Sequence, residues 1–443
     1  MSIGKYLRIM VKRTIAGLFF LGFVCVSHAQ PMLMTIEQLF ELADKNSKDI
    51  QLHNLMINEA DQAVKVAKNK LLPTIDAKAE FSYIGDGVMT DRDFSNGIHA
   101  DMPHFGNSFV LKASQVVYSG GAISGNIERS KLEAVKARHE YDISRQDLRF
   151  LLLGYYLDLF QLNNQKIVYE RNVEQTQILV KDMRVAYDQG TALKSDITRY
   201  ELQLQNLQLG LTATKNKINV LNYKLATTLG LDSDAVILPD TTALFNMTVE
   251  RKMENDWMEE SKFTPQMELA NTEIEICKNN ERLVRAEKLP KVSISVTNDF
   301  NGPILVEVPP LDNNFNYWFA GVSLSYSFDA LFKTGKKMKQ AKLATLQSQT
   351  RRELTEEHIS NAIHEAFVNL NEAYVRLETQ QKSVQLAHEN YGIVRQRYIN
   401  GLALITDMLD ASTTQLDMEL QLANYQIGIL YQYYLLKKIT GTL

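Results

Sequence analysis

The fold is decided by a stretch near the C-terminus that reads Tyr398-Ile-Asn-Gly-Leu-Ala-Leu-Ile-Thr-Asp407, because an earlier stretch repeats it. The earlier copy reads Tyr187-Asp-Gln-Gly-Thr-Ala-Leu-Lys-Ser-Asp196, with Tyr, Gly, Ala, Leu and Asp in the same register. Each copy runs into a long helical pattern that ends at a glycine, Gly230 or Gly441. Self-similarity on this scale indicates an internal two-fold repeat.

Each copy predicts a helix, a glycine-centred tip and a returning helix. After the first tip, apolar residues recur at alternating spacings of four and three, which is the seam of a coiled coil. A similar seam runs from Leu404 to Leu436, and a second seam on the first returning helix contains Leu202, Leu209 and Tyr223. Two seams suit a helix with neighbours on both sides, as in the wall of a tube. A long surface hairpin with extra apolar residues is the plainer alternative.

The N-terminal residues indicate an exported protein, and the net charge limits its partners. Residues 1–29 predict a secretory signal peptide, with a basic start, an apolar core at 16–26 and a cleavage site at Ser27-His28-Ala29. Val24 is too bulky before Cys25 for a lipoprotein signal. Removing residues 1–29 changes the net charge from −4 to −8, because four basic and no acidic residues are lost. That charge argues against nucleic acid as a partner, and Cys277 alone cannot form an intramolecular disulfide.

Two strands follow the first helix of each copy, where Leu-Pro stops at Pro73 and Pro290 end the helical pattern. We expect strands at about 74–84 and 108–118 in the first copy and at about 291–300 and 317–328 in the second. Each run is about ten residues, the length of a tilted strand that crosses an outer membrane. Aromatic residues gather near the strand ends, as in an interfacial girdle: Tyr83, Tyr118, Phe300, Trp318 and Phe328. A soluble amphipathic sheet has the same alternation and is the alternative.

The number of strands bears on assembly. A membrane barrel must close, because lipid offers no partner to an edge strand, and closure needs at least about eight strands. Four strands per chain therefore require a dimer or a trimer, and only the twelve strands of a trimer leave an aqueous lumen. A helix from about 122 to 188 would be roughly 100 Å long, which is far more than a membrane thickness.

These features together resemble the outer-membrane efflux (TolC-like) channel family. The resemblance rests on the doubled helix–strand–strand–helix unit, the two Leu-Pro stops, Gly120-Gly121, both tips and the stretch Asp407-Met-Leu-Asp410-Ala-Ser-Thr-Thr414. It implies a mainly α protein with membrane β-structure, in which a homotrimer builds a 12-stranded barrel and its coiled-coil hairpins form an α-barrel tunnel. The expected domains are 30–230 for repeat 1, 231–262 for a linker and 263–443 for repeat 2.

The function implied by the resemblance is a passive conduit in a tripartite efflux or type I secretion system. Such a channel lies in the outer membrane of a Gram-negative bacterium, extends into the periplasm, and docks a periplasmic adaptor protein and an inner-membrane pump. A duct makes few specific contacts, so the pump would select the cargo. The alternative is a structural or adaptor protein, a periplasmic coiled coil with a β-rich head, which would not need a lipid-facing band.

The resemblance also assigns residues at the tips. Asp407 and Asp410 match the acidic ring of the periplasmic aperture; they share one helix face at i and i+3, and three copies would crowd six carboxylates around one axis. Tyr398, Asp196 and Ser195 match a polar tether that closes the tips, whereas Ala403 replaces an arginine of that tether. The hairpin tips that would dock the adaptor are Gly190, Ala192, Leu193, Gly401, Ala403 and Leu404.

Catalytic motifs are missing from the sequence. His364-Glu365 lacks the second histidine of a zinc protease, and neither a phosphate-binding loop nor a nucleophile elbow is present. His99 and His104, with Asp101 between them, could bind a metal, although a solvated polar loop explains them better. We therefore expect no enzyme activity, no cofactor and no resident metal.

Overall fold

The structure is a computed structural model that describes residues 32–240, 252–307 and 310–443. The expected signal peptide at 1–29 lies outside the described residues. The chain divides into two compact units. Unit 1 contains Met1–Ser47, Leu151–Val249 and Ala373–Tyr431, and unit 2 contains Lys48–Phe150, Glu250–Glu372 and Gln432–Leu443. Two long helices, α4 (Ala122–Asp188) and α9 (Ala330–Ile399), contribute to both units.

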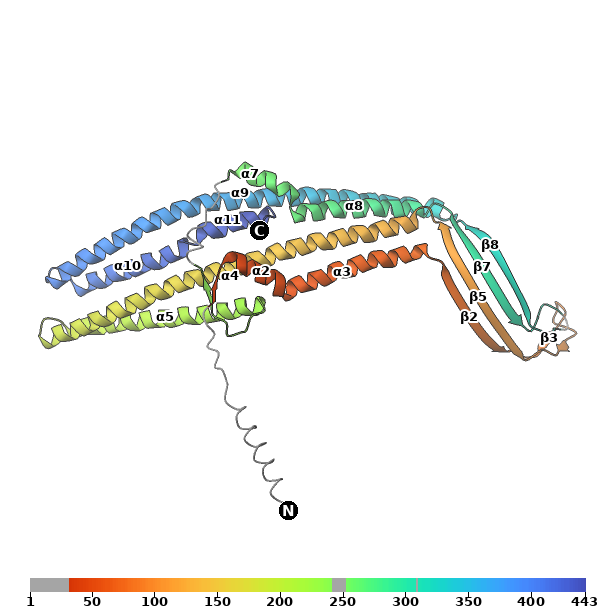
Figure 1. The fold of residues 1–443 in the computed structure, drawn as a ribbon, viewed down its shortest axis with the longest axis horizontal. Helices are drawn as coiled ribbons and strands as arrows, with labels where there is room; N and C mark the ends of the chain where they lie inside the picture. Colours follow the sequence, from red (N-terminus) through yellow and green to blue (C-terminus); the bar gives the residue numbers. More distant parts are fainter. Residues whose placement is uncertain (1–31, 241–251, 308–309) are drawn as a thin grey trace, which may run out of the picture. The chain divides into compact units, whose positions relative to one another are not determined.

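Unit 2 carries an antiparallel four-stranded sheet with the order β2-β5-β7-β8 (Figure 1). The strands are β2 (Thr74–Tyr83), β5 (Phe105–Tyr118), β7 (Lys291–Gly302) and β8 (Phe315–Ser325). A two-stranded hairpin, β3 (Gly87–Met89) and β4 (Ile98–Ala100), lies between the first two in sequence. β2 and β7 begin directly after Pro73 and Pro290, where proline removes a backbone donor and excludes the α conformation from the preceding residue.

The ends of two strands differ from the sequence-based expectation. β5 begins at Phe105, where its residues still pair with β2 as far as Tyr83. β8 ends at Ser325, so Phe328 is not part of the strand. The reason is a turn: the Ser327 hydroxyl donates to Asp329 Oδ1 at 2.5 Å, and the Ala330 backbone N–H donates to the Ser327 carbonyl at 3.1 Å. This turn starts α9.

In unit 2, helices precede and follow each pair of sheet strands along the chain. They are α3 (Lys48–Lys68) with the 3₁₀ turn η1 (Asn69–Leu71), α8 (Pro265–Ala286), the early parts of α4 and α9, α7 (Glu254–Glu260) with η2 (Ser261–Phe263), and most of α11 (Gly428–Ile439). Thr264 caps α8 by accepting the Met267 backbone N–H at 3.3 Å. Proline at the first position of α8 suits this start, because its missing N–H would have no partner there.

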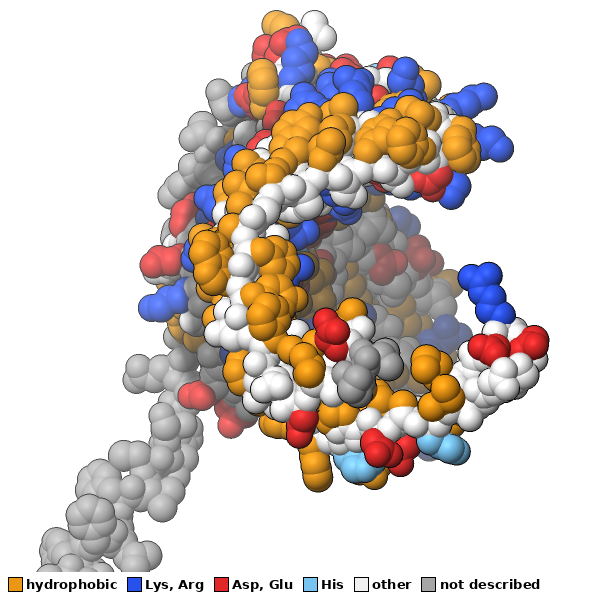
Figure 2. Space-filling view, turned by 90° about the vertical axis from the view of Figure 1, so that its right-hand side faces the viewer, with side chains coloured by type: hydrophobic (Ala, Val, Ile, Leu, Met, Phe, Trp, Pro, Cys, Tyr) orange, Lys and Arg blue, Asp and Glu red, His pale blue; other side chains and the backbone are white. Residues whose placement is uncertain are grey.

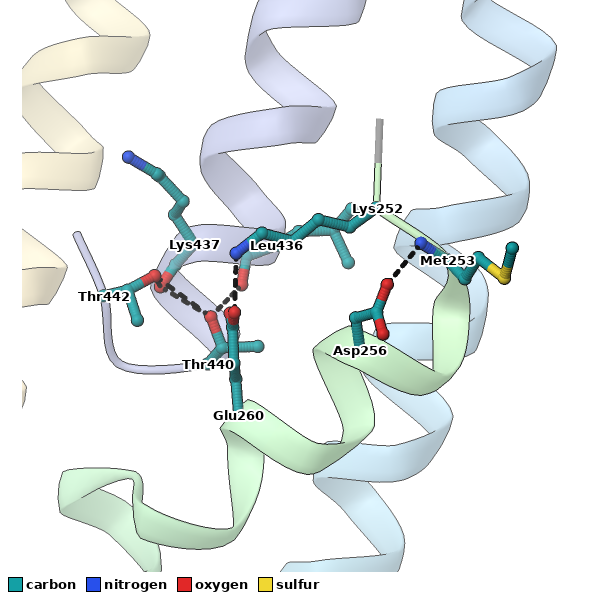
Figure 3. Close-up of polar contacts among 8 residues, drawn as sticks. All are labelled: Lys252, Met253, Asp256, Glu260, Leu436, Lys437, Thr440 and Thr442. Carbon is teal, nitrogen blue, oxygen red and sulfur yellow. Dashed lines mark hydrogen bonds and ion pairs between the residues drawn. The ribbon is translucent and has the colours of Figure 1, made fainter. Parts of the chain in front are cut away.

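The short helix α7 packs on the C-terminal helix α11. The Trp257 ring is buried and meets Tyr433 edge to face, with ring centroids 6.1 Å apart. The Lys252 ammonium lies 4.7 Å from the centroid of the Trp257 ring. Lys252 also pairs with Glu260 at 2.5 Å, next to Thr440 in Figure 3. Burial of a tryptophan removes a large apolar area from water, so this contact anchors the end of the expected linker segment.

Unit 1 consists of two helical hairpins and a small parallel β-pair. The hairpins are the later part of α4 with α5 (Lys194–Thr228), and the later part of α9 with α10 (Ile405–Tyr425); the unit also contains β1 (Met32–Met34), α2 (Ile36–Asn46) and β6 (Ile237–Pro239). Buried Tyr156 ties the pair to α4: its hydroxyl donates to the Met34 carbonyl at 2.7 Å and accepts the Asp240 N–H at 3.0 Å.

The two apolar seams of α5 have different environments. Tyr200 and Leu207 of the first seam are 1% and 3% exposed, so this seam packs inside the chain. Leu202 and Leu209 of the second seam are 63% and 70% exposed. The second seam is therefore not covered by the described residues of the same chain.

Within the described ranges, none of the helices combines the length and the apolar character needed to cross a membrane.

Candidate gate at the helical tips

The two hairpin tips of unit 1 have the same backbone conformation. Gly190 follows α4 with φ +74°, and Gly401 follows α9 with φ +72°. Each glycine N–H donates back to the tyrosine three residues earlier, Tyr187 or Tyr398, at 2.9 Å. A left-handed residue at this position closes a helix C-terminus and favours glycine, because a Cβ would be strained there.

A carboxylate begins the returning helix at each tip. Asp196 Oδ2 accepts the Leu193 N–H at 3.2 Å, and Asp407 Oδ2 accepts the Leu404 N–H at 3.0 Å. Both aspartates are in the first helical turn, where a negative charge also suits the helix dipole. Asp407 thus has a structural role that our sequence interpretation missed, although the repeated Ala-Leu-x-x-Asp register was its signal.

Most of the predicted tip residues border one cleft. This cleft has a volume of about 700 Å³, and its lining includes Ala192, Leu193, Ser195, Asp196, Tyr398, Gly401, Ala403 and Leu404. The remaining predicted residues, Gly190, Asp407 and Asp410, are not part of this lining, and both aspartates are exposed on α10. The structure therefore brings the tether residues together with all the predicted docking residues except Gly190, and it leaves the acidic pair on the surface.

A small apolar cluster holds the two hairpins together next to the cleft. Its buried members are Val180, Met183, Tyr200 and Ile405, and Tyr398 packs against them. The Tyr398 hydroxyl donates to Met183 Sδ at 3.2 Å. Burial raises the pKa of Tyr398, and the nearby Asp196 carboxylate raises it further. Within the chain, Tyr398 is thus close to Asp196 while its hydroxyl is bonded to Met183.

Further from the tips, a buried carboxylate joins three helices. Glu419 on α10 is 6% exposed and pairs with Arg171 of α4 and with His388 of α9, whose Nε2 lies 2.9 Å from Glu419 Oε1. Buried Gln415 also donates to Glu419 Oε1 at 3.0 Å. A buried charge requires such partners, so this network links the first hairpin to both helices of the second. Our sequence interpretation did not predict this network.

Of the two histidines considered as metal ligands, His99 lies in β4 and His104 directly precedes β5. His104 stacks on Tyr83 with ring centroids 5.3 Å apart, and its Nδ1 lies 3.0 Å from the Ile84 carbonyl oxygen. In the part of the chain that the structure describes, no group of three His, Cys, Asp or Glu side chains is placed to hold a metal ion.

A family model for outer membrane efflux proteins matches residues 39–231 and 259–442, which is most of the chain. The chain therefore belongs to the outer membrane efflux protein family, and the resemblance inferred from the sequence is confirmed. This is a family of channel proteins, not enzymes, located in the cell outer membrane and extending into the periplasm. No curated protein sequence matches the chain.

Solved structures show the same fold. The outer membrane protein VceC from Vibrio cholerae matches with a TM-score of 0.75 at 14% identity, covering 91% of this chain and 96% of that one. The Campylobacter jejuni CmeC outer membrane channel matches with a TM-score of 0.74 at 14% identity, covering 92% and 85%. The Neisseria gonorrhoeae MtrE outer membrane channel, solved in its open state, matches at 0.73 and 15% identity, covering 92% and 88%.

Proposed function

We propose that three copies of the chain form one conduit across the outer membrane and the periplasm. In this assembly, the four strands of each protomer contribute to a 12-stranded transmembrane barrel. The helical hairpins continue the barrel as a tunnel, and the tips close its periplasmic end. The domain division into repeat 1 (30–230), linker (231–262) and repeat 2 (263–443) belongs to the same proposal, with each repeat supplying one strand pair and one hairpin.

One observation carries the proposal, namely the two unpaired edges of the sheet. Among the described residues, β2 pairs only with β5, and β8 pairs only with β7. Every residue of both edge strands is exposed in the single chain. An edge strand in lipid leaves backbone donors and acceptors without partners, at a cost of several kcal/mol for each group. Pairing β8 of one copy with β2 of the next removes all the edges.

The exposed second seam of α5 supports the same assembly. Leu202, Leu209 and Tyr223 have the heptad spacing that is typical of a helix face packed against another helix. In the single chain, each of these side chains is more than half exposed. A neighbouring protomer would cover them. Burial of such side chains contributes about 25 cal/mol for each Å² removed from water, so the seam favours association.

The tips supply the proposed gate. Asp407 and Asp410 are both exposed, and a trimer would place six carboxylates around its axis, where mutual repulsion and attraction of cations are expected. Tyr398, Ser195 and Asp196 border one cleft, which suits the proposed tether between hairpins. Ala403 on the same cleft cannot supply a charge to it.

The tips also supply the proposed docking surface for a periplasmic adaptor, which connects the conduit to an inner-membrane pump. Leu193, Leu402 and Leu404 are 68%, 68% and 69% exposed. Large apolar side chains that cluster on a surface mark an interaction site. The pump selects the cargo in this scheme, and the chain is a passive duct.

The experiment that tests the proposal measures the mass of the purified protein and its conductance in lipid bilayers. The full chain purified in detergent should have the mass of three copies, and reconstitution into planar bilayers should give discrete single-channel currents. A monomeric mass together with bilayers that stay silent would contradict the proposal.

A further inference from the structure

Positive charge gathers where the sheet of unit 2 joins its helices. Residues 282–291, which end at the first residue of β7, and residues 329–342, which follow β8, contain nine basic and two acidic residues in total. The whole chain has a net charge of −4. Figure 2 shows Lys and Arg side chains exposed next to hydrophobic ones at the end of the molecule that carries the strands. The cluster is therefore a local reversal of the charge of the chain.

The lysines in the first turns of α9 fall into two groups. Lys333 pairs with Asp329 at 2.7 Å, and Lys337 pairs with Glu287 at 2.7 Å. Lys336 and Lys339 are exposed and make no hydrogen bond or ion pair with any residue that the structure describes. The protein thus neutralises two of the four lysines and leaves the other two to solvent.

The two unpaired lysines share one helix face with apolar side chains. Phe332, Lys336, Lys339 and Leu343 follow one another at spacings of four, three and four residues, which places them on one side of α9. Phe332 is 73% exposed and Leu343 is 56% exposed. We call these four residues the Lys336 face.

The Lys336 face is electrostatically unfavourable for the protein alone. Like charges three residues apart on a helix repel each other, and neither ammonium group has an acidic partner among the described residues. A local arrangement that costs stability without a compensating contact in the chain indicates a function. An anion next to both ammonium groups would relieve the repulsion, and a neighbouring apolar phase would cover Phe332.

We propose that the Lys336 face binds the headgroup phosphates of anionic phospholipids at the membrane surface, with Phe332 inserted among the acyl chains. The proposal rests on the proposed function, since it needs β8 to cross the membrane. β8 ends at Ser325, and Phe332 follows seven residues later, so the face lies next to the strand end. Lysine beside an exposed aromatic ring is typical of membrane-interface segments.

The test measures phospholipid binding to the full-length protein in low-salt detergent. Phosphatidylglycerol and phosphatidylethanolamine are titrated separately, and bound lipid is counted by native mass spectrometry. Each lysine near an anionic lipid surface contributes about fivefold in affinity. The double variant Lys336→Gln with Lys339→Gln should therefore bind phosphatidylglycerol about thirtyfold more weakly than the wild type. Arginine at both positions should retain the binding.

The matched control is Lys333→Gln with Lys337→Gln, which removes the same charge from the same stretch of α9. Because an acidic residue already neutralises each of these lysines, its phosphatidylglycerol affinity should stay within a few-fold of the wild type. Equal losses in both double variants would overturn the proposal, as would equal wild-type affinity for the two lipids or displacement by inorganic phosphate at the same concentration. Single-channel currents measured on the same samples show separately whether the conduit itself exists.

Discussion

Removing Arg171 should loosen α10 from the first hairpin, because the buried Glu419 carboxylate would lose its guanidinium partner. Breaking a fully buried ion pair costs about 3–5 kcal/mol, whereas exposed pairs contribute about 0–1 kcal/mol. Glu419 has a side-chain exposure of 5%, but Arg171 and His388 are 47% and 46% exposed, so water screens part of the loss. We expect a cost of about 2 kcal/mol for Arg171→Gln, between these limits.

Hydrogen exchange of individual backbone amides measures this loss of stability locally. About 2 kcal/mol corresponds to roughly thirtyfold faster exchange of the α10 amides near Glu419, provided that they exchange through local opening. Glu419→Gln should cost less, since it leaves no buried charge, and the double variant should exchange like Glu419→Gln alone. Arg184→Gln is the control, because Arg184 and its partner Glu201 are 64% and 43% exposed. Unchanged exchange in Arg171→Gln, or a double variant that exchanges as fast as Arg171→Gln, would show that Arg171 does not stabilise the buried Glu419 carboxylate.

Three shorter predictions concern the gate, the sheet and the tips. Asp407→Asn combined with Asp410→Asn should weaken the block of single-channel current by divalent cations about tenfold or more, because both carboxylates attract cations. Asp410→Asn alone should also weaken the block, and it leaves the Asp407 bond at the helix start intact. An unchanged block in the double variant would show that the acidic pair does not line the aperture. In the proposed barrel Val322 faces lipid and Ser323 faces the lumen, so lysine at Val322 should impair trimer recovery by more than lysine at Ser323, since a lysine facing lipid costs about 2–4 kcal/mol; equal recovery would contradict this assignment of the two faces. Gly401→Ala should cost about 1 kcal/mol at φ +72°, seen as faster exchange at the end of α9, and no change would show that the tip relaxes without strain.

Much of the fold could be predicted from local signals. Pro73 and Pro290 end helices by the loss of a backbone donor, so the start of β2 and β7 could be read from the sequence. The glycines at 190 and 401 marked both tips, because a left-handed backbone favours glycine there. The end of β8 could not be placed, since the alternation continues to Phe328 while side-chain bonds at Asp329 already form the turn.

The residues of the two repeated tip motifs could be predicted from the sequence. Contacts between residues distant in sequence could not be predicted. The register of the repeat identified Asp196 and Asp407 as equivalent positions. The structure adds that each carboxylate accepts a backbone N–H at the start of its helix. Arg171 and Glu419 are 248 residues apart, and no spacing rule connects them. Their pairing depends on how α4 packs against α10, which periodicity alone does not define.

The most direct test of the account is disulfide cross-linking between the two edge strands, in a mature protein whose remaining cysteine is replaced by Cys277→Ser. Cysteine at Ala79 of β2 is combined in turn with cysteine at Trp318, Ala320 or Val322 of β8. Opposed residues of neighbouring strands have Cα atoms about 4.5–5.5 Å apart, within the range of a disulfide. We predict that at least one pair gives a covalent trimer on a denaturing gel, whereas each single-cysteine variant stays monomeric. Cross-links only within one chain, or none for any pair, would contradict closure of the barrel by three copies.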